Sequence, residues 1–170
     1  MHNNKVVNII GWIIAILSTA LYTLTQYPTI SFWDGAEFAT TSSTLQISHP
    51  PGAPFFQLLG SILPIAYISP LFSGLSVMML YYICVYVLSR FSQMYPGIIT
   101  SSIIGALTFA VLDSQWFCAN EIDVYPLSLL LSLLSIFLTI KWTQTHRVNY
   151  LILICLLLGL SLCVHQLTLL

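Results

Sequence analysis

Long apolar runs separated by short polar segments organise the whole sequence. A membrane-spanning helix needs about 20 mostly apolar residues. Five runs approach that length, and we predict a spanning helix in each: 6–26, 71–89, 98–112, 125–140 and 150–170. The run at 98–112 is the shortest, and we expect its helix to extend by a turn.

A sixth apolar run, 53–68, is interrupted by Pro54, Gly60 and Pro64. If this run does not span, the four basic residues fall on one side of the membrane and the five acids on the other. If it spans, three of the four basic residues move outside. Basic residues in short loops favour the cytoplasm, so we predict that 53–68 lies in the outer interface or dips into it.

The predicted topology has a cytoplasmic N-terminus and two outer loops, 27–70 and 113–124. A cleaved signal peptide is an alternative for the N-terminus, but its apolar stretch is longer than a signal core of about 7–15 residues. The fifth run reaches Leu170 without a polar tail. We therefore expect a single membrane domain, 1–170, that forms the front part of a larger protein.

Composition agrees with this pattern. Hydrophobic residues make up 58% of the 170 residues and charged residues 5%, whereas a soluble domain carries about 25% charged residues. The fold class predicted is an all-α polytopic membrane protein with interfacial helices in its first outer loop. No basic patch is present for nucleic acid. The four cysteines lack a CxxC spacing, so neither a disulfide framework nor a zinc site is indicated.

Asp34 and Glu37 are the candidate catalytic residues. We predict a helix with Ser31 as its N-cap that runs to about Leu45, on which acids three apart share a face. One interpretation is that both acids only complement the positive end of the helix. The other starts from the flanking aromatic residues, which hold the helix at the membrane surface. Acids there have raised pKa values, which suit a general base.

His49 begins the segment His49-Pro50-Pro51-Gly52. Two prolines hold an extended backbone, and a glycine permits a sharp turn into the next helix. The residue types allow two roles for His49: a contact to substrate or phosphate, and a structural role in a rigid corner.

The second outer loop carries Glu121 and Asp123, two residues apart. In a non-helical segment the pair could face one ligand or one divalent cation, although hard cations prefer six or more oxygens. A solvated loop is the alternative. His165, followed by Gln166, is expected near the outer third of the last span, where it either bonds to a neighbouring helix or lines a cavity.

These motifs together resemble a bacterial membrane-protein family related to the eukaryotic transmembrane O-mannosyltransferase of plexin-type receptors. The family pattern is similar to S-F-W-D-C-G-E-F followed by G-H-P-P-G-A-P, and here Gly35, Ala36 and Ser48 depart from it. Residues 116–125 resemble W-F-x-A-x-E-x-E-V-Y, with Asp123 in place of the second Glu. Residues 159–165 resemble G-L-S-x-G-V-H, with Cys163 in place of Gly.

The resemblance implies a GT-C glycosyltransferase, an all-helical membrane enzyme whose first outer loop carries the catalytic acid. Its donor is a sugar on a polyprenyl phosphate that enters from the membrane lipid. The usual chain is several times longer, so donor and acceptor sites would lie further along it. We therefore expect no transfer by the 170-residue chain alone.

The leading functional hypothesis is transfer of a sugar, mannose in particular, to a protein hydroxyl or glycan acceptor on the outer face of a bacterial inner membrane. Asp34 would deprotonate the acceptor and Glu37 would orient it or the sugar. The predicted substrate-binding residues are His49, Glu121, Asp123 and His165.

No Lys or Arg faces outward to neutralise the leaving phosphate. A later segment, a cation at Glu121 and Asp123, or His49 would have to supply that charge. A transporter or lipid-carrier module is the alternative, and it predicts ionisable groups near the bilayer midplane. An inactive remnant of a split gene is the third hypothesis.

Overall fold

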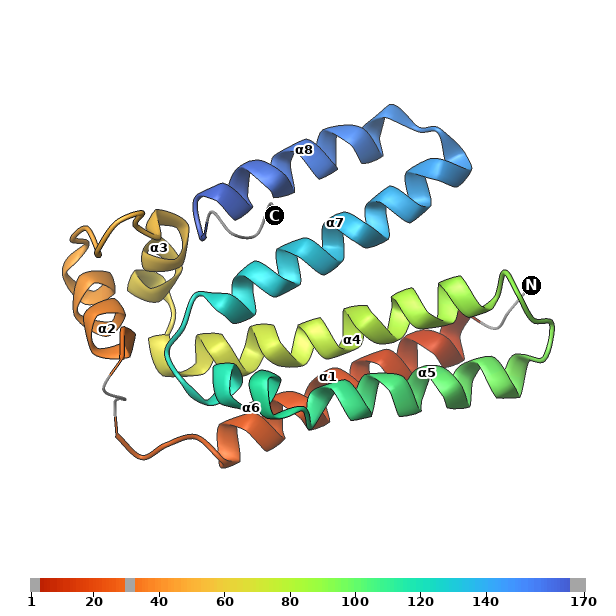
Figure 1. Ribbon diagram of the computed structural model, residues 1–170, viewed down its shortest axis with the longest axis horizontal. Coiled ribbons are helices and arrows are strands. Elements are labelled where there is room, and N and C mark those ends of the chain that lie inside the picture. Colours follow the sequence, from red (N-terminus) through yellow and green to blue (C-terminus); the bar gives the residue numbers. More distant parts are fainter. Residues whose placement is uncertain (1–3, 30–32, 166–170) are drawn as a thin grey trace.

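Every regular element is a helix in the residues that the computed structural model describes, 4–29 and 33–165 (Figure 1). The elements, in order, are α1 (Asn4–Leu24), α2 (Gly35–Thr44), α3 (Pro54–Ile62), the 3₁₀ helix η1 (Ile65–Tyr67), α4 (Ile68–Leu88), α5 (Tyr95–Ala110), α6 (Asp113–Asn120), α7 (Tyr125–Thr145) and α8 (Val148–Leu162). This confirms the predicted all-α class.

Within the described residues, three segments are long and apolar enough to cross a membrane: Lys5–Leu24, Ile65–Leu88 and Tyr125–Thr145. They correspond to the first, second and fourth predicted spans. Helices α5 and α6 make a fourth if the pair, bent by 60°, counts as one span. Helix α8 is apolar but has only 15 residues, so the count of five spans stays a prediction.

As predicted, the run at 53–68 does not form a spanning helix of its own, although residues 65–68 begin the second candidate span. Helix α3 has nine residues, a length of about 14 Å at 1.5 Å per residue, against a hydrocarbon core of about 30 Å. It begins at Pro54, and α5 and α7 also carry a proline in their first turn. Proline suits this position because its backbone nitrogen has no hydrogen to leave unpaired.

The last predicted span, 150–170, is wrong at its end, because helix α8 stops at Leu162. The Cys163 carbonyl accepts a hydrogen bond from the Phe55 N–H of α3 at 3.1 Å, and Val164 is fully buried in a cluster with residues of α2, α3 and α7. The chain therefore turns into the protein interior. His165 follows the helix rather than standing inside a span, and Gln166 lies outside the described residues.

The second predicted loop, 113–124, is two-thirds helical. Leu112 is extended, and the eight-residue helix α6 follows it. The chain becomes extended again at Glu121, with φ −110° and ψ 158°. A short non-helical segment with bends at Glu121, Ile122 and Val124 therefore carries Glu121 and Asp123 into α7.

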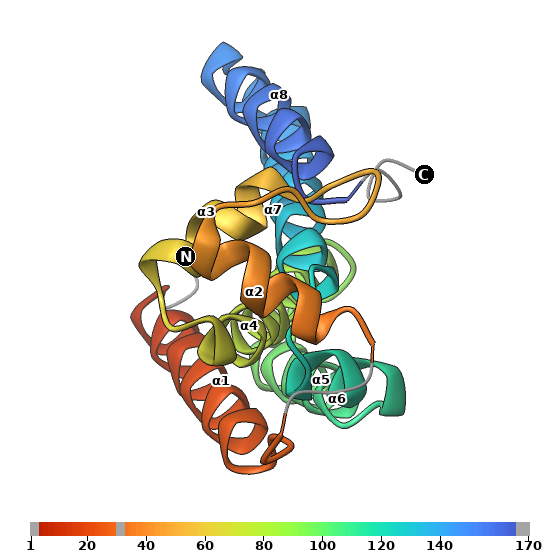
Figure 2. The ribbon, with the colours of Figure 1, turned by 90° about the vertical axis from the view of Figure 1, so that its left-hand side faces the viewer.

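Helix α4 is the centre of the molecule, with α1, α5 and α7 packed around it (Figure 2). Small residues let these helices approach closely. Ser69, Ser73 and Ser76 are fully buried on α4. At Gly74 an added Cβ would collide with Thr19 Oγ1 and lie 2.9 Å from the Ala15 carbonyl oxygen of α1.

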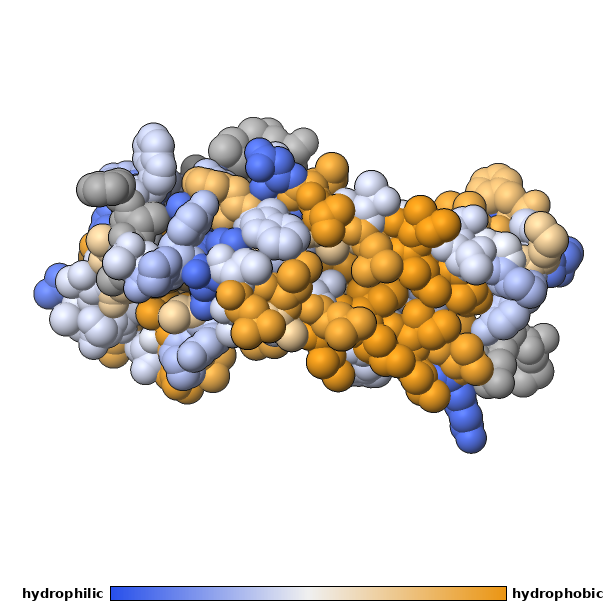
Figure 3. All heavy atoms as spheres, turned by 90° about the horizontal axis from the view of Figure 1, so that it is seen from below, coloured by the Kyte–Doolittle hydropathy of each residue, from blue (hydrophilic) through white to orange (hydrophobic). Residues whose placement is uncertain are grey.

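The two ends of the molecule carry opposite charges. The start of α1, the α4–α5 connection and the α7–α8 turn share one end, and α2, α3 and α6 share the other (Figure 1). The four basic residues lie toward the first end: Lys5, Arg90, Lys141 and Arg147. The five acids lie at the second: Asp34, Glu37, Asp113, Glu121 and Asp123. Between the ends, apolar side chains form a broad band (Figure 3).

Candidate functional site

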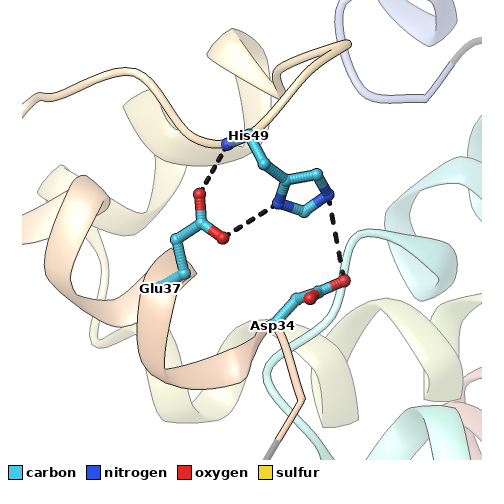
Figure 4. A group of neighbouring side chains, drawn as sticks. All are labelled: Asp34, Glu37 and His49. Atoms are coloured by element: carbon cyan, nitrogen blue, oxygen red, sulfur yellow. Dashed lines mark hydrogen bonds and ion pairs between the residues drawn. The ribbon is translucent and has the colours of Figure 1, made fainter.

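Helix α2 carries the two acids of the first loop. It begins at Gly35 with Asp34 in the N-cap position, while the predicted N-cap Ser31 lies outside the described residues. Glu37 falls in the first turn, one turn beyond Asp34. Both side chains point from this end of the helix toward the ring of His49 (Figure 4).

Glu37 holds His49 with both of its carboxylate oxygens (Figure 4). The His49 backbone N–H donates to Oε1 at 2.5 Å, and Nδ1 of the ring lies 2.9 Å from Oε2. An ionised carboxylate only accepts hydrogen bonds, so Nδ1 carries the proton. The second ring nitrogen, Nε2, then lies 3.9 Å from Asp34 Oδ2.

This contact shifts both partners' pKa values. The hydrogen bond from the His49 side chain, with that from its backbone, lowers the pKa of Glu37. The same side-chain hydrogen bond to Glu37, together with the charges of Glu37 and Asp34, raises the pKa of His49. The ion pair is open to solvent, since 46% of the His49 side chain and 38% of the Glu37 side chain are exposed.

A tight turn presents His49 to the acids. The Gly52 N–H donates to the His49 carbonyl at 2.8 Å, and the Pro50–Pro51 peptide bond inside this turn is cis. Gly52 has φ +82°, a conformation that glycine adopts at no steric cost. The predicted sharp turn at Gly52 is confirmed.

Buried aromatic rings pack against the site. Phe38, one residue after Glu37, packs edge-on against Phe56 of α3 with ring centroids 5.4 Å apart. Both phenylalanines are buried. The His49 ring lies 5.9 Å from the Phe38 ring. Helices α2 and α3 therefore fix the position of His49 through apolar packing as well as through Glu37.

A small pocket of about 70 Å³ opens beside His49 and collects residues from three distant segments. The first loop contributes Asp34 and His49, the segment before α7 contributes Asp123, and the chain after α8 contributes His165. Four of the six predicted site residues thus line one pocket. The fifth, Glu37, adjoins it through His49.

Asp123 is held in place by α4. The Asp123 backbone N–H donates to Ser69 Oγ at 3.1 Å, and the Ser69 hydroxyl donates to the Asp123 carbonyl oxygen at 3.3 Å. Asp123 Oδ1 accepts a hydrogen bond from the Tyr125 N–H at 3.3 Å. Burial raises the pKa of Asp123 to about 6, and the charges of Asp34 and Glu121 act in the same direction.

Glu121 is the sixth predicted site residue, and the structure does not bring it to this pocket. It lines a different pocket of about 170 Å³ with Gln26 and Asn120. Residues two apart in a regular strand would share a face, but the chain bends at Glu121, Ile122 and Val124, and the two side chains reach different pockets. The predicted shared cation site of Glu121 and Asp123 therefore has no common pocket.

Ser48 is a pocket residue that the sequence did not single out as functional. It is 4% exposed and lines the pocket, and its hydroxyl has no hydrogen-bond partner among the described residues. Its sequence signals are its position directly before His49 and its departure from the glycine of the family pattern. Ser69 gave no signal at all, because one serine among several in an apolar helix is ordinary packing.

Asp34, Glu37 and His49 also offer a group of metal-ligating atoms. One such atom from each residue lies within 4.8 Å of the other two. Within the described part of the chain, these three residues form the one group of at least three His, Cys, Asp or Glu side chains that lie close enough together to hold an ion. Neither Glu121 nor Asp123 belongs to it.

Comparison with known proteins covers most of the chain. The protein family described as "Protein O-mannosyl-transferase TMEM260 N-terminal domain" matches residues 34–170. A mouse protein O-mannosyl-transferase TMEM260 is 30% identical over 132 residues, which cover 74% of this chain and 18% of the mouse protein. A Dictyostelium discoideum protein O-mannosyl-transferase tmem260 is 40% identical over 47 residues, 28% of this chain and 6% of that protein. No solved structure matches the chain.

Proposed function

The chain belongs to the family of the protein O-mannosyl-transferase TMEM260 N-terminal domain, and from this premise we propose that it forms the catalytic-acid part of a membrane mannosyltransferase. The proposed reaction moves mannose from a polyprenyl phosphate to a hydroxyl of an acceptor protein on the outer face. Mannose as the sugar and a protein as the acceptor follow from the names of the relatives. The lipid-phosphate donor is our addition, drawn from the GT-C resemblance.

The observation that carries the proposal is the position of Asp34. It lies at the start of α2 and lines the pocket, and 61% of its side chain is exposed. A general base must lie within hydrogen-bond reach of the proton it removes. An exposed carboxylate at the edge of a pocket meets that requirement for an acceptor hydroxyl arriving from outside.

Asp34 is a better candidate for the base than Glu37. Both oxygens of Glu37 already accept hydrogen bonds from His49, and these lower the pKa of Glu37. The Asp34 carboxylate has a single contact to His49, at 3.9 Å. Asp34 therefore keeps the capacity to accept a proton from substrate, and Glu37 positions His49.

The proposed step is a single displacement. The acceptor hydroxyl gives its proton to Asp34 while its oxygen forms a bond to the anomeric carbon of mannose. The bond from that carbon to the phosphate oxygen breaks, and the electron pair leaves with the lipid phosphate. Because the acceptor attacks opposite the leaving group, the anomeric configuration is inverted.

The distribution of charge supports surface chemistry rather than transport. A transporter is expected to carry ionisable groups near the bilayer midplane, whereas the five acids here lie at one end of the bundle. The positive-inside rule places the basic end in the cytoplasm. We therefore propose a cytoplasmic N-terminus and a site on the outer face of the membrane, which for a bacterial chain is the inner membrane.

The test is a donor comparison with the native-length protein that contains this segment. Membranes are supplied with radiolabelled mannose on a polyprenyl phosphate or on a nucleotide diphosphate, with an acceptor protein present and lipid-phosphate mannose synthesis blocked. We expect label in the acceptor protein only from the lipid donor. Transfer from the nucleotide donor under these conditions, or from neither donor, would contradict the proposal.

A further inference from the structure

The site lacks a basic residue for the leaving phosphate. The four Lys and Arg residues lie toward the opposite end of the molecule, so the candidate site is surrounded by acids. A developing phosphate charge is normally stabilised by Lys, Arg or a metal ion. An acidic site with no Lys or Arg repels a phosphate and attracts a cation.

The His49 ring has the geometry of a metal ligand. Ligating histidines almost always donate their second ring N–H to a carboxylate or carbonyl, which fixes the ring and leaves the other nitrogen for the metal. Glu37 holds Nδ1 in this way, at 2.9 Å. The free nitrogen, Nε2, faces the carboxylate of Asp34 (Figure 4).

The distance between the two prospective ligands suits a shared ion. Nitrogen and oxygen ligands lie about 2.0–2.2 Å from a bound zinc-sized cation, so two of them cannot be more than about 4.3 Å apart. His49 Nε2 and Asp34 Oδ2 are 3.9 Å apart. Asp34 has a second carboxylate oxygen, so one can bind an ion while the other takes a proton.

The pocket itself points independently to a polar occupant. The Ser48 hydroxyl lines it, is buried, and has no hydrogen-bond partner among the described residues. A buried hydroxyl without a hydrogen-bond partner is unfavourable. The volume is about 70 Å³, and one water needs at least about 10–15 Å³ by a comparable measure. The pocket therefore has room for an ion and a few waters.

We propose that the pocket binds one divalent cation through His49 Nε2 and the Asp34 carboxylate, with Glu37 orienting His49 and Ser48 hydrogen-bonding a water on the ion. This cation site lies in the first loop and not at Glu121 and Asp123, where the sequence pattern placed it. An imidazole with a carboxylate suits a transition metal such as Mn²⁺. The ion's role, neutralising the leaving phosphate, rests on the proposed transfer reaction, whereas its binding does not.

The experiment measures Mn²⁺ binding to the purified chain in lipid nanodiscs at pH 7.5, from the loss of the electron paramagnetic resonance signal of free Mn²⁺. Asp34→Asn and His49→Gln should each weaken binding at least tenfold. Glu37→Gln should weaken it by about 10- to 100-fold, as expected for a residue that orients a ligand. The matched control is Glu121→Gln, an acid at the same end but in another pocket, which should leave binding unchanged.

The possible results separate the hypotheses. Absence of Mn²⁺ binding by the wild-type chain, or equal binding by Asp34→Asn and His49→Gln, would overturn the proposal. Loss of binding in Glu121→Gln alone would return the ion to the second loop. Circular dichroism of each variant checks folding. No donor or acceptor is present, so a failed transfer assay leaves this measurement standing.

Discussion

Two pairs of acids lie at the same end of this protein and are used differently. Asp34 and Glu37 are three apart on α2 and both face His49. Glu121 and Asp123 are two apart in a bent, non-helical segment and line separate pockets. Three residues make nearly one helical turn, so such acids share a face, whereas bends at Glu121, Ile122 and Val124 separate the second pair. Backbone conformation, more than the number of carboxylates, decides which acids act together.

The two pairs also differ in their electrostatics. Hydrogen bonds from His49 lower the pKa of Glu37, while burial raises the pKa of Asp123 to about 6. Glu37 of the first pair is therefore stabilised in its charged form by His49. Asp123 is held in a place where its charge is unfavourable, and Ser69 fixes it there through the backbone.

The largest expected effect concerns the side of the membrane on which the two acid pairs lie. Single cysteines replacing Ser43 in α2 and Ser114 in α6 should react with an impermeant thiol reagent from outside. Cysteines replacing Gln93 and Thr145, near the basic end, should not react in intact cells. All four side chains are exposed, so access to the reagent depends on the side of the membrane.

A background without the four native cysteines serves as the control for this labelling experiment. Reaction at Gln93→Cys from outside would mean that the helices are arranged differently across the membrane. Labelling of Ser43→Cys but not of Ser114→Cys would place the two acidic regions on opposite faces of the membrane, so the two pairs of acids would not lie at the same surface.

The next effect concerns the contact between Glu37 and His49. Glu37→Gln removes the charge that holds the imidazole, so the pKa of His49 should fall toward its ordinary value. NMR titration of the His49 ring measures this change. Transfer by the native-length protein should drop by up to about 10²-fold, because a misplaced group in a site costs that much.

Asp113→Asn is the matched control for Glu37→Gln, since Asp113 lies at the same end but outside the pocket. It should leave both the His49 titration and the transfer rate unchanged. An unaltered His49 titration in Glu37→Gln would show that Glu37 does not hold the ring.

The smallest effect concerns Asp123. Its pKa is about 6 in the folded protein against an ordinary 3.8, so the folded state binds the proton more tightly. The contribution of Asp123 to the free energy of unfolding is then largest at low pH, falls between about pH 4 and pH 6, and stays constant above pH 6. A shift of about two pH units corresponds to at most about 3 kcal/mol. Asp123→Asn should therefore gain up to about 3 kcal/mol over wild type between pH 4 and pH 7.

The measurement is the free energy of unfolding in mixed detergent micelles at both pH values. A difference between Asp123→Asn and wild type that does not change with pH would contradict the buried position of Asp123.

The sequence predicted most of the fold, because membrane helices are specified by local apolar composition. The helices α1, α4 and α7 follow from it within a few residues. It failed where distant segments decide. Helix α8 ends at Leu162 because Val164 is buried against residues far away in sequence and the Cys163 carbonyl accepts a hydrogen bond from the Phe55 N–H. The apolar run at 150–170 predicts neither contact.

The candidate site was predictable to the same extent. The helical spacing of Asp34 and Glu37 and the turn after His49 are local features, and the structure has both. Three features depend on how loops far apart in sequence meet. They are the hydrogen bonds of His49 to both Glu37 oxygens, the unpaired hydroxyl of Ser48, and the separation of Glu121 from Asp123. Spacing alone does not encode these contacts.

The measurement that most directly tests the central claim compares transfer by Asp34→Asn and Glu121→Gln in the native-length protein at equal membrane levels. Both substitutions replace a carboxylate by its amide at the same end of the molecule. Asp34→Asn should lower transfer by about 10²- to 10⁴-fold, the usual loss of a general base, and Glu121→Gln should leave transfer near wild type. Near-normal transfer by Asp34→Asn, with loss in Glu121→Gln, would contradict the account and place the essential acid in the second loop.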